Sequence, residues 1–89
     1  MVESNIIIIN KLGLHARAAA KLVATAGAFG SSIQIGVRDK SVDGKSIMAV
    51  MMLAANKGTE ITVRCDGEDE QAALSAVLDI ISQRFGEAE

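Results

Sequence analysis

The sequence predicts an α+β fold in two layers, with a four-stranded, mostly antiparallel sheet and three helices on one face. Four short runs are either β-branched or alternate apolar with polar residues, which is typical of strands. Two longer segments repeat apolar residues every three or four positions, the spacing of amphipathic helices. A short apolar helix is predicted between these two amphipathic helices, so the order of elements along the chain is β-α-β-β-α-β-α. This order favours an arrangement with the helices on one face of a sheet. The 89 residues leave room for a single domain, 1–89.

The first strand and the first helix are separated by a turn. The run Ile6–Ile9 is β-branched and too short for a helix, so residues 3–11 are predicted to hold a strand. Leu12-Gly13 predicts a turn, and a helix begins at about Ala16 and stops near Gly30. Its apolar face is predicted to comprise Ala19, Leu22, Val23, Ala26 and Phe29.

A hairpin and a short helix follow. Alternation in "SSIQIGVR" predicts a half-buried strand, which turns at residues 38–40 into a short strand at 41–43. Ser46 precedes an apolar run and is a favoured N-cap residue, since its hydroxyl can accept a bond from a free helix amide. The helix should cover about 47–53 and lie near an edge or end of the sheet, with Val50 and Leu53 in the core.

The last strand and helix complete the order. Residues 60–66 alternate Ile61, Val63 and Cys65, which predicts a strand with the cysteine in the core. Gly67 breaks the chain, and Asp69 or a neighbour is predicted to cap the final helix before Gly86. The buried face of that helix is predicted to be Ala73, Leu74, Val77, Leu78, Ile81 and Phe85.

Composition excludes several classes of function. The net charge is −2 without a basic block, which argues against a nucleic-acid binder. One cysteine and one histidine make neither an internal disulfide nor a local zinc set, and no cofactor motif appears, so we expect no metal and no cofactor. No segment resembles a signal peptide or a membrane span, which predicts a cytoplasmic protein without membrane insertion. The acidic residues near the end suggest a solvated tail.

The single histidine, His15, lies at the predicted start of the first helix. The first amides of a helix lack intrahelical partners and, with the helix dipole, favour an anion. A phosphoryl group on this imidazole would meet the amides of Ala16 and Arg17, and the Arg17 guanidinium offers a forked donor suited to phosphate oxygens. A neutral imidazole is also a nucleophile. The simpler alternative is that His15 caps the helix and that Arg17 keeps the surface soluble.

Two stretches carry a family resemblance. "KLGLHARAAAKLV" and, about thirty residues later, "GKSIMAVMMLAANKGTEITV" resemble the histidine-containing phosphocarrier (HPr) family of the bacterial phosphotransferase system. The resemblance implies an open-faced β-sandwich in which His15 accepts a phosphoryl group on Nδ1 from enzyme I, charged by phosphoenolpyruvate, and passes it to enzyme IIA proteins. It implies that Arg17 stabilises the phosphate. Such a protein is a phosphotransfer partner with a phosphohistidine intermediate, not a stand-alone catalyst.

The chain departs from the family pattern at one position. The family usually has His-Ala-Arg-Pro, and Ala18 replaces that proline here. Proline in a first turn pre-sets φ, whereas alanine restores an amide and keeps high helix propensity. We expect a slightly less rigid first turn with unchanged chemistry.

Ser46 corresponds to the family's second modification site, where a dedicated kinase in many Gram-positive bacteria phosphorylates the serine. The simpler alternative is an N-cap without a kinase. A phosphate at a helix start need not unfold the helix, and its charge could block partners. The partners this implies are a serine kinase and phosphorylase, and the competing function is a regulatory module read through Ser46.

The apolar residues after Ser46 predict a docking face. A short helix buries only one stripe, yet "SIMAVMML" is apolar nearly all round. Exposed methionines suit faces that accommodate several partners. The resemblance implies contact with enzyme I and enzyme IIA proteins through Ile47, Met48 and Met51. It leaves open whether the acceptors belong to the sugar branch or the nitrogen-related branch, and we expect a monomer because partners must reach the His15 face.

Overall fold

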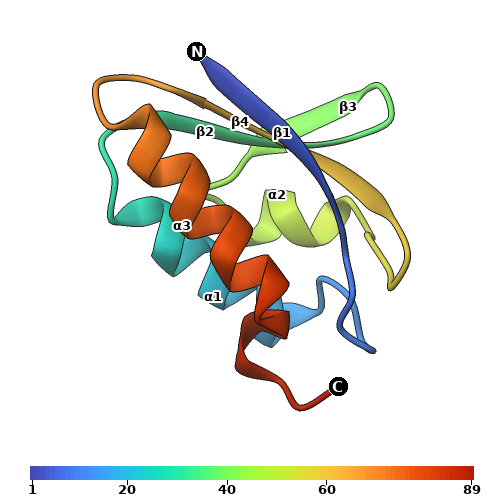
Figure 1. Ribbon diagram of the computed structural model, residues 1–89. Coiled ribbons are helices and arrows are strands. Elements are labelled where there is room, and N and C mark those ends of the chain that lie inside the picture. Colours follow the sequence, from blue (N-terminus) through green and yellow to red (C-terminus); the bar gives the residue numbers. More distant parts are fainter.

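The computed structural model describes residues 1–89 and confirms the two-layer α+β fold, a four-stranded sheet with helices over one face (Figure 1). The two long helices, α1 and α3, lie side by side beneath the sheet, and the short α2 lies beside α1 (Figure 1). The elements are β1 (Val2–Ile7), α1 (Ala16–Gly27), β2 (Ser32–Val37), β3 (Lys40–Asp43), α2 (Ile47–Met52), β4 (Glu60–Asp66), α3 (Glu70–Ser82) and the 3-10 turn η1 (Arg84–Gly86).

The sheet has the order β1-β4-β2-β3, and all three strand pairings are antiparallel. β4 is therefore central and pairs with both β1 and β2. The register places Cys65 opposite Val2 on one side and Ile33 on the other. The predicted alternation is confirmed, because Ile33 and Ile35 of β2 and alternate residues of β4 are buried.

The core lies between the sheet and the helices. Cys65 is fully buried there, as predicted. The helices contribute one face each, which the 3.6-residue period brings to a single side. The buried residues of these faces are Ala18, Ala19, Leu22 and Ala26 in α1 and Ala73, Val77 and Ile81 in α3.

The short helix α2 packs against the edge strand β3, which confirms the predicted position near an edge of the sheet, and it also packs against α1. Ser46 is its N-cap, because the Ala49 N–H donates to Ser46 Oγ at 3.3 Å. Val50 and Leu53 are buried, also as predicted.

The last helix begins after the predicted cap residue, but it differs from the prediction in two details. Asp69 occupies the N-cap position of α3, but its carboxylate makes no cap bond; it accepts the N–H groups of Gly30 and Ser31 at 2.9 Å each, and the Ser31 hydroxyl. Phe85 is buried, but not on the helix, because α3 ends at Ser82. The residues after Ser82 form a turn that the helical period did not indicate.

Candidate functional site

His15 is the N-cap residue of α1, with an extended backbone (φ −74°, ψ 177°) and no hydrogen bond from its side chain to the helix. The capping interpretation of His15 is therefore wrong in its usual form. Its carbonyl accepts the Ala19 N–H at 2.8 Å, while the amides of Ala16, Arg17 and Ala18 have no intrahelical acceptor. The imidazole thus stands at a helix end with free donors, the arrangement that favours a bound anion.

Arg17 is exposed and has neither a hydrogen bond nor an ion pair within the chain. It lies in the first turn of α1 and borders an open hollow of about 650 Å³. Lys11 and Lys21 also line this hollow, together with Glu87 and Glu89, so its lining carries both signs of charge. Lys11 pairs with Glu89 and Lys21 Nζ donates to the Phe85 carbonyl, so Arg17 is the cation in this lining that has no partner within the chain.

The C-terminal segment reaches this site, which the sequence did not indicate. Glu87 Oε2 is in hydrogen-bond contact with His15 Nε2, and Glu87 Oε1 accepts a bond from Asn10 Nδ2 at 2.8 Å. Both ionisable side chains are largely covered, with 28% of His15 and 16% of Glu87 exposed. The prediction of a solvated acidic tail is wrong for Glu87.

A left-handed turn brings Glu87 to His15. Arg84, Phe85 and Gly86 have φ of 57°, 55° and 78°, so three successive residues are in the left-handed region. Phe85 is fully buried, and its carbonyl accepts Lys21 Nζ at 2.7 Å. The Lys11 N–H donates to the Glu89 carbonyl at 2.7 Å, which ties the tail to the loop before His15.

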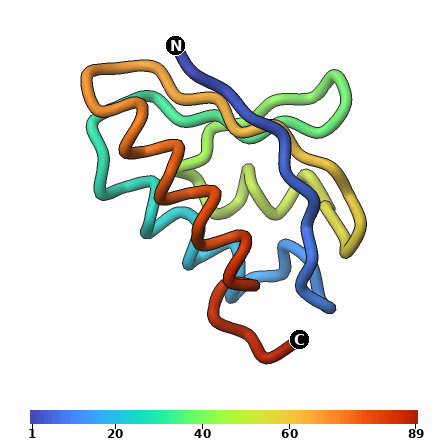
Figure 2. Tube along the Cα trace, in the orientation of Figure 1, coloured from blue at the N-terminus to red at the C-terminus, as the bar shows by residue number.

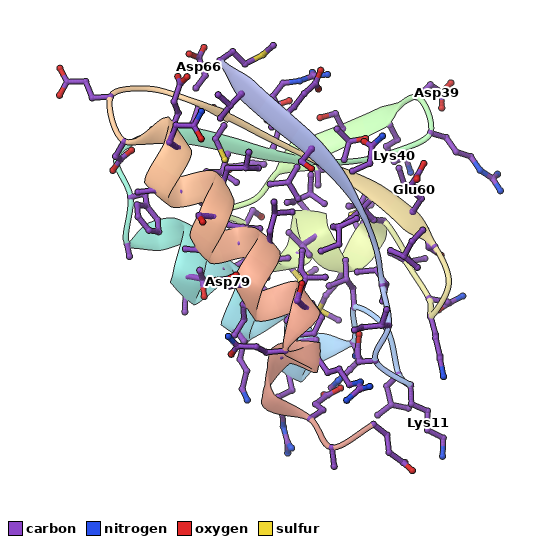
Figure 3. The ribbon with its side chains drawn as sticks, viewed as in Figure 1. Lys11, Asp39, Lys40, Glu60, Asp66 and Asp79 are labelled. Carbon is purple, nitrogen blue, oxygen red and sulfur yellow. The ribbon has the colours of Figure 1, made fainter.

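The pictures show the same arrangement. The end of the chain turns back beneath α3 and runs beside the loop that joins β1 to α1 (Figure 2). Lys11 of that loop lies at the same end of the molecule as the tail, away from Asp39 and Lys40 of the β2–β3 hairpin (Figure 3). The site is therefore built from the loop before α1, the first turn of α1 and the C-terminal tail.

The pKa of Glu87 is lowered, mainly by the hydrogen bond from Asn10, and further by His15 and Arg17. Burial opposes this effect. The carboxyl group is therefore ionised at neutral pH, and it can act only as an acceptor toward its two neighbours.

Asn10 is the buried centre of the loop. It is fully buried, and its Nδ2 donates both to the Gly13 carbonyl and to Glu87, each at 2.8 Å. Gly13 has φ +65°, and a Cβ at this position would lie 2.5 Å from the Ala55 carbonyl oxygen, closer than van der Waals contact allows. The turn predicted at Leu12-Gly13 is confirmed, and it determines the path of the backbone that leads to His15.

The remaining candidate residues lie on α2. Ser46 is half-buried at the N-terminus of the helix. The predicted docking residues Ile47, Met48 and Met51 are exposed, and Met52 and Leu12, which were not among the predicted docking residues, are exposed as well. We call the exposed residues of α2, Ile47, Met48, Met51 and Met52, the apolar patch.

No group of three or more His, Cys, Asp or Glu side chains is arranged to hold a metal ion. No helix is both long and apolar enough to cross a membrane.

An open sheet that presents one histidine beside the free amides at the start of α1 is an arrangement suited to a small carrier of an anionic group. A family model described as "PTS HPr component phosphorylation site" matches residues 2–83. The phosphocarrier protein HPr of Pseudomonas aeruginosa is 56% identical over 90 residues, and the alignment covers all of both chains. The chain belongs to the HPr phosphocarrier family of the phosphotransferase system.

Solved structures agree with this assignment. The structure of HPr-C-His from Thermoanaerobacter tengcongensis matches with a TM-score of 0.96 at 43% identity, over the full length of both chains. A structure described as an HPr dimer from the same organism matches with a TM-score of 0.79 at 44% identity, over 98% of this chain and all of that one.

Proposed function

We propose that the protein accepts a phosphoryl group on Nδ1 of His15 from phosphorylated enzyme I and passes it to enzyme IIA proteins. One observation carries this proposal. Nδ1 of His15 has no hydrogen-bond partner, at a helix start whose amides are free and whose first turn bears the unpaired Arg17. Family membership supplies the reaction class.

The chemistry follows from these groups. The lone pair on Nδ1 attacks phosphorus, a bond forms between them, and the bond from phosphorus to the donor atom breaks with its electron pair. The amides of Ala16 and Arg17 can donate to the phosphoryl oxygens, and the guanidinium can donate to two oxygens at once. In the second transfer an acceptor nucleophile attacks phosphorus, and the electron pair of the N–P bond returns to the imidazole.

The test uses enzyme I and phosphoenolpyruvate. The protein should gain the mass of one phosphate in an acid-labile form, and His15→Ala should gain none. Arg17→Ala should slow acceptance about tenfold or more, because one charged donor to the transition state is lost. Lys40→Ala removes the same charge at the distant hairpin and should not slow acceptance. An acid-stable adduct, or labelling that survives His15→Ala, would refute the proposal.

We propose that the apolar patch contacts both the donor and the acceptors through Ile47, Met48 and Met51, because these side chains are exposed and methionine adapts to different surfaces.

The acceptor branch is tested separately. Phosphorylated protein is offered in turn to a sugar-branch and a nitrogen-branch IIA protein. Faster phosphorylation of one IIA protein favours its branch as the source of the acceptor.

We further propose that the protein acts as a cytoplasmic monomer, so that the His15 site stays open to each partner. Sedimentation at working concentration tests the oligomeric state. A stable dimer, as described for the Thermoanaerobacter structure, would contradict a monomer.

A second candidate function is regulation through Ser46. The observation that favours it is position: the Ser46 hydroxyl caps α2 immediately before the apolar patch. A phosphate there would add about two negative charges beside a docking surface. With a serine kinase and ATP, an acid-stable adduct should form and be lost in Ser46→Ala. Absence of that adduct with an active kinase would contradict this function.

A further inference from the structure

The carboxylate of Glu87 engages one nitrogen of the His15 ring and leaves the other free. Its two oxygens have one partner each: Oε1 accepts from Asn10 Nδ2, and Oε2 meets Nε2 of His15. No other side chain contacts the imidazole by a hydrogen bond or an ion pair. The two ring nitrogens therefore differ in what they can do.

The ionised Glu87 carboxylate determines which nitrogen of the His15 ring carries the hydrogen. An ionised carboxylate has no hydrogen to donate, so a hydrogen bond between Glu87 and Nε2 requires the hydrogen on Nε2. In the neutral imidazole the other nitrogen, Nδ1, then carries the lone pair.

We propose that Glu87 is a positioning residue that holds the His15 imidazole with its proton on Nε2, so that Nδ1 is the nucleophile in phosphoryl acceptance and a neutral leaving group in phosphoryl release. This inference rests on the proposed function. It adds a second task for the carboxylate, because the ring becomes positively charged when Nδ1 is phosphorylated and retains the Nε2 proton.

The proton balance is simple. During acceptance the N–P bond forms at Nδ1 and Nε2 keeps its hydrogen, so the ring gains one positive charge, which Glu87 faces. During release the N–P electron pair returns to Nδ1, and the ring leaves as neutral imidazole. Without the Nε2 proton the leaving group would be the far more basic imidazolate. Glu87 thus acts in both transfers without itself gaining or losing a proton.

Asn10 fixes the position of this carboxylate. Its amide nitrogen has two acceptors, the Gly13 carbonyl and Glu87 Oε1, while its buried oxygen Oδ1 has no partner. An orphaned buried acceptor is unfavourable. The amide orientation is therefore determined by the two bonds from Nδ2, one to the loop before His15 and one to the tail.

The backbone of the tail is held in a disfavoured conformation to reach this place. Left-handed φ values are disfavoured for residues with a Cβ, and both Arg84 and Phe85 adopt them. Such conformations persist where the surroundings determine them, and they concentrate at functional sites. Here the burial of Phe85 and the bond from Lys21 Nζ to its carbonyl hold the turn.

A carboxylate is required because two acceptor atoms are needed. In Glu87→Gln one of the two oxygens becomes an NH₂ group of nearly equal size. If the remaining oxygen faces His15, the NH₂ group faces the Asn10 donor; if it faces Asn10, the NH₂ group faces Nε2 and favours a proton on Nδ1. The first arrangement places two donors opposite each other, which favours the second, so the substitution shifts the ring toward the Nδ1–H tautomer with little change in packing.

The matched control is Glu89→Gln. Glu89 lies two residues further along the tail, and its exposed carboxylate pairs with Lys11 Nζ at 3.6 Å, so this variant loses the same charge without touching His15. Thermal unfolding of each variant confirms that it is folded. Glu87→Ala is a second variant that removes both oxygens.

The first measurement is the ¹⁵N chemical shifts of the His15 ring in the unphosphorylated protein near neutral pH. The wild type and Glu89→Gln should show the Nε2–H form, and Glu87→Gln should show a larger share of Nδ1–H. The second measurement is the rate of phosphoryl acceptance from enzyme I. It should fall about ten- to a hundredfold in Glu87→Gln, mainly in kcat, because groups that orient a functional imidazole commonly have effects of this size or more.

Two results would overturn the inference: unchanged ring shifts in both Glu87 variants, or changed shifts with an unchanged transfer rate. A slower transfer with unchanged ring shifts also overturns the inference, because Glu87 then has only a structural role. If the wild type accepts no phosphoryl group at all, the proposed function fails, and the shifts alone still decide the tautomer.

Discussion

Gly13 controls the approach of the chain to His15, and a single methyl group tests that control. The backbone at Gly13 has φ +65°, and a Cβ built there would lie 2.5 Å from the Ala55 carbonyl oxygen and 2.8 Å from Asn56 Cα. The same carbonyl accepts the Leu14 N–H at 2.9 Å. Gly13→Ala must therefore push the loop away from residues 55–56 and break the bond that seats Leu14 beside His15.

The magnitude has two parts. A left-handed backbone costs about 1–2 kcal/mol for a residue with a Cβ, and forcing an atom into a packed place costs about 1–3 kcal/mol. We therefore expect Gly13→Ala to lower the free energy of unfolding by about 2–5 kcal/mol.

Two other glycines separate these parts. Gly58 has φ +92° with open space around its Cβ position, so Gly58→Ala should cost only the conformational part, about 1–2 kcal/mol. Gly30 has open space and no left-handed φ, so Gly30→Ala should change stability by less than about 0.5 kcal/mol.

The assay is urea unfolding of the three variants and the wild type, followed by phosphoryl acceptance under conditions where each is folded. Gly13→Ala should be the least stable and should also accept the phosphoryl group more slowly, since His15 is displaced. The reasoning is refuted if Gly13→Ala is no less stable than Gly58→Ala, because the close approach to Ala55 would then carry no cost.

Three further predictions concern stability and docking. The hydrogen bond from Ser31 Oγ, with those from backbone amides, lowers the pKa of Asp69. The ionised carboxylate therefore stabilises the folded protein at pH values above the ordinary pKa of aspartate, and this stabilisation is lost as the pH falls through the lowered pKa. Asp69→Asn should thus be less stable than the wild type at pH 7, with a gap that narrows below about pH 4 in urea titrations; a gap independent of pH would contradict this. Met48→Lys should raise the KM for phosphorylated enzyme I while the unfolding midpoint stays unchanged, because Met48 is 71% exposed; an unchanged KM would remove Met48 from the docking surface. Ile81→Ala should lower the free energy of unfolding by about 2–5 kcal/mol in the same urea assay, since Ile81 is fully buried, and a loss below about 1 kcal/mol would show that the site collapses around the cavity.

The fold could be predicted from local patterns because each element is short and regular. Alternation located β2 and β4, and the helical period located α1. The element order then allowed few arrangements in which both long helices cover one face. The pairing of β1 with β4 was not predicted, because the two strands are far apart in the sequence and no local pattern indicates that they pair.

The site could be predicted only where its residues are neighbours in the sequence. His15 and Arg17 were found because both belong to one helix start. Glu87 was missed because it reaches His15 across 72 positions, and a contact over that separation leaves no local pattern. Arg84 and Phe85 were read as helix because neither residue type signals a left-handed backbone.

The same long separations also decide when the sheet can assemble. β1 is made first, yet its only strand partner is β4, so Val2 has no cross-strand neighbour until Cys65 has been synthesised. Up to that point only local structure, such as α1 and the β2–β3 hairpin, has its partners within reach. Pairings between distant segments slow folding, because a long loop must close before the contacts form. We therefore expect the insertion of β4 between β1 and β2 to be the late, cooperative step that completes the protein.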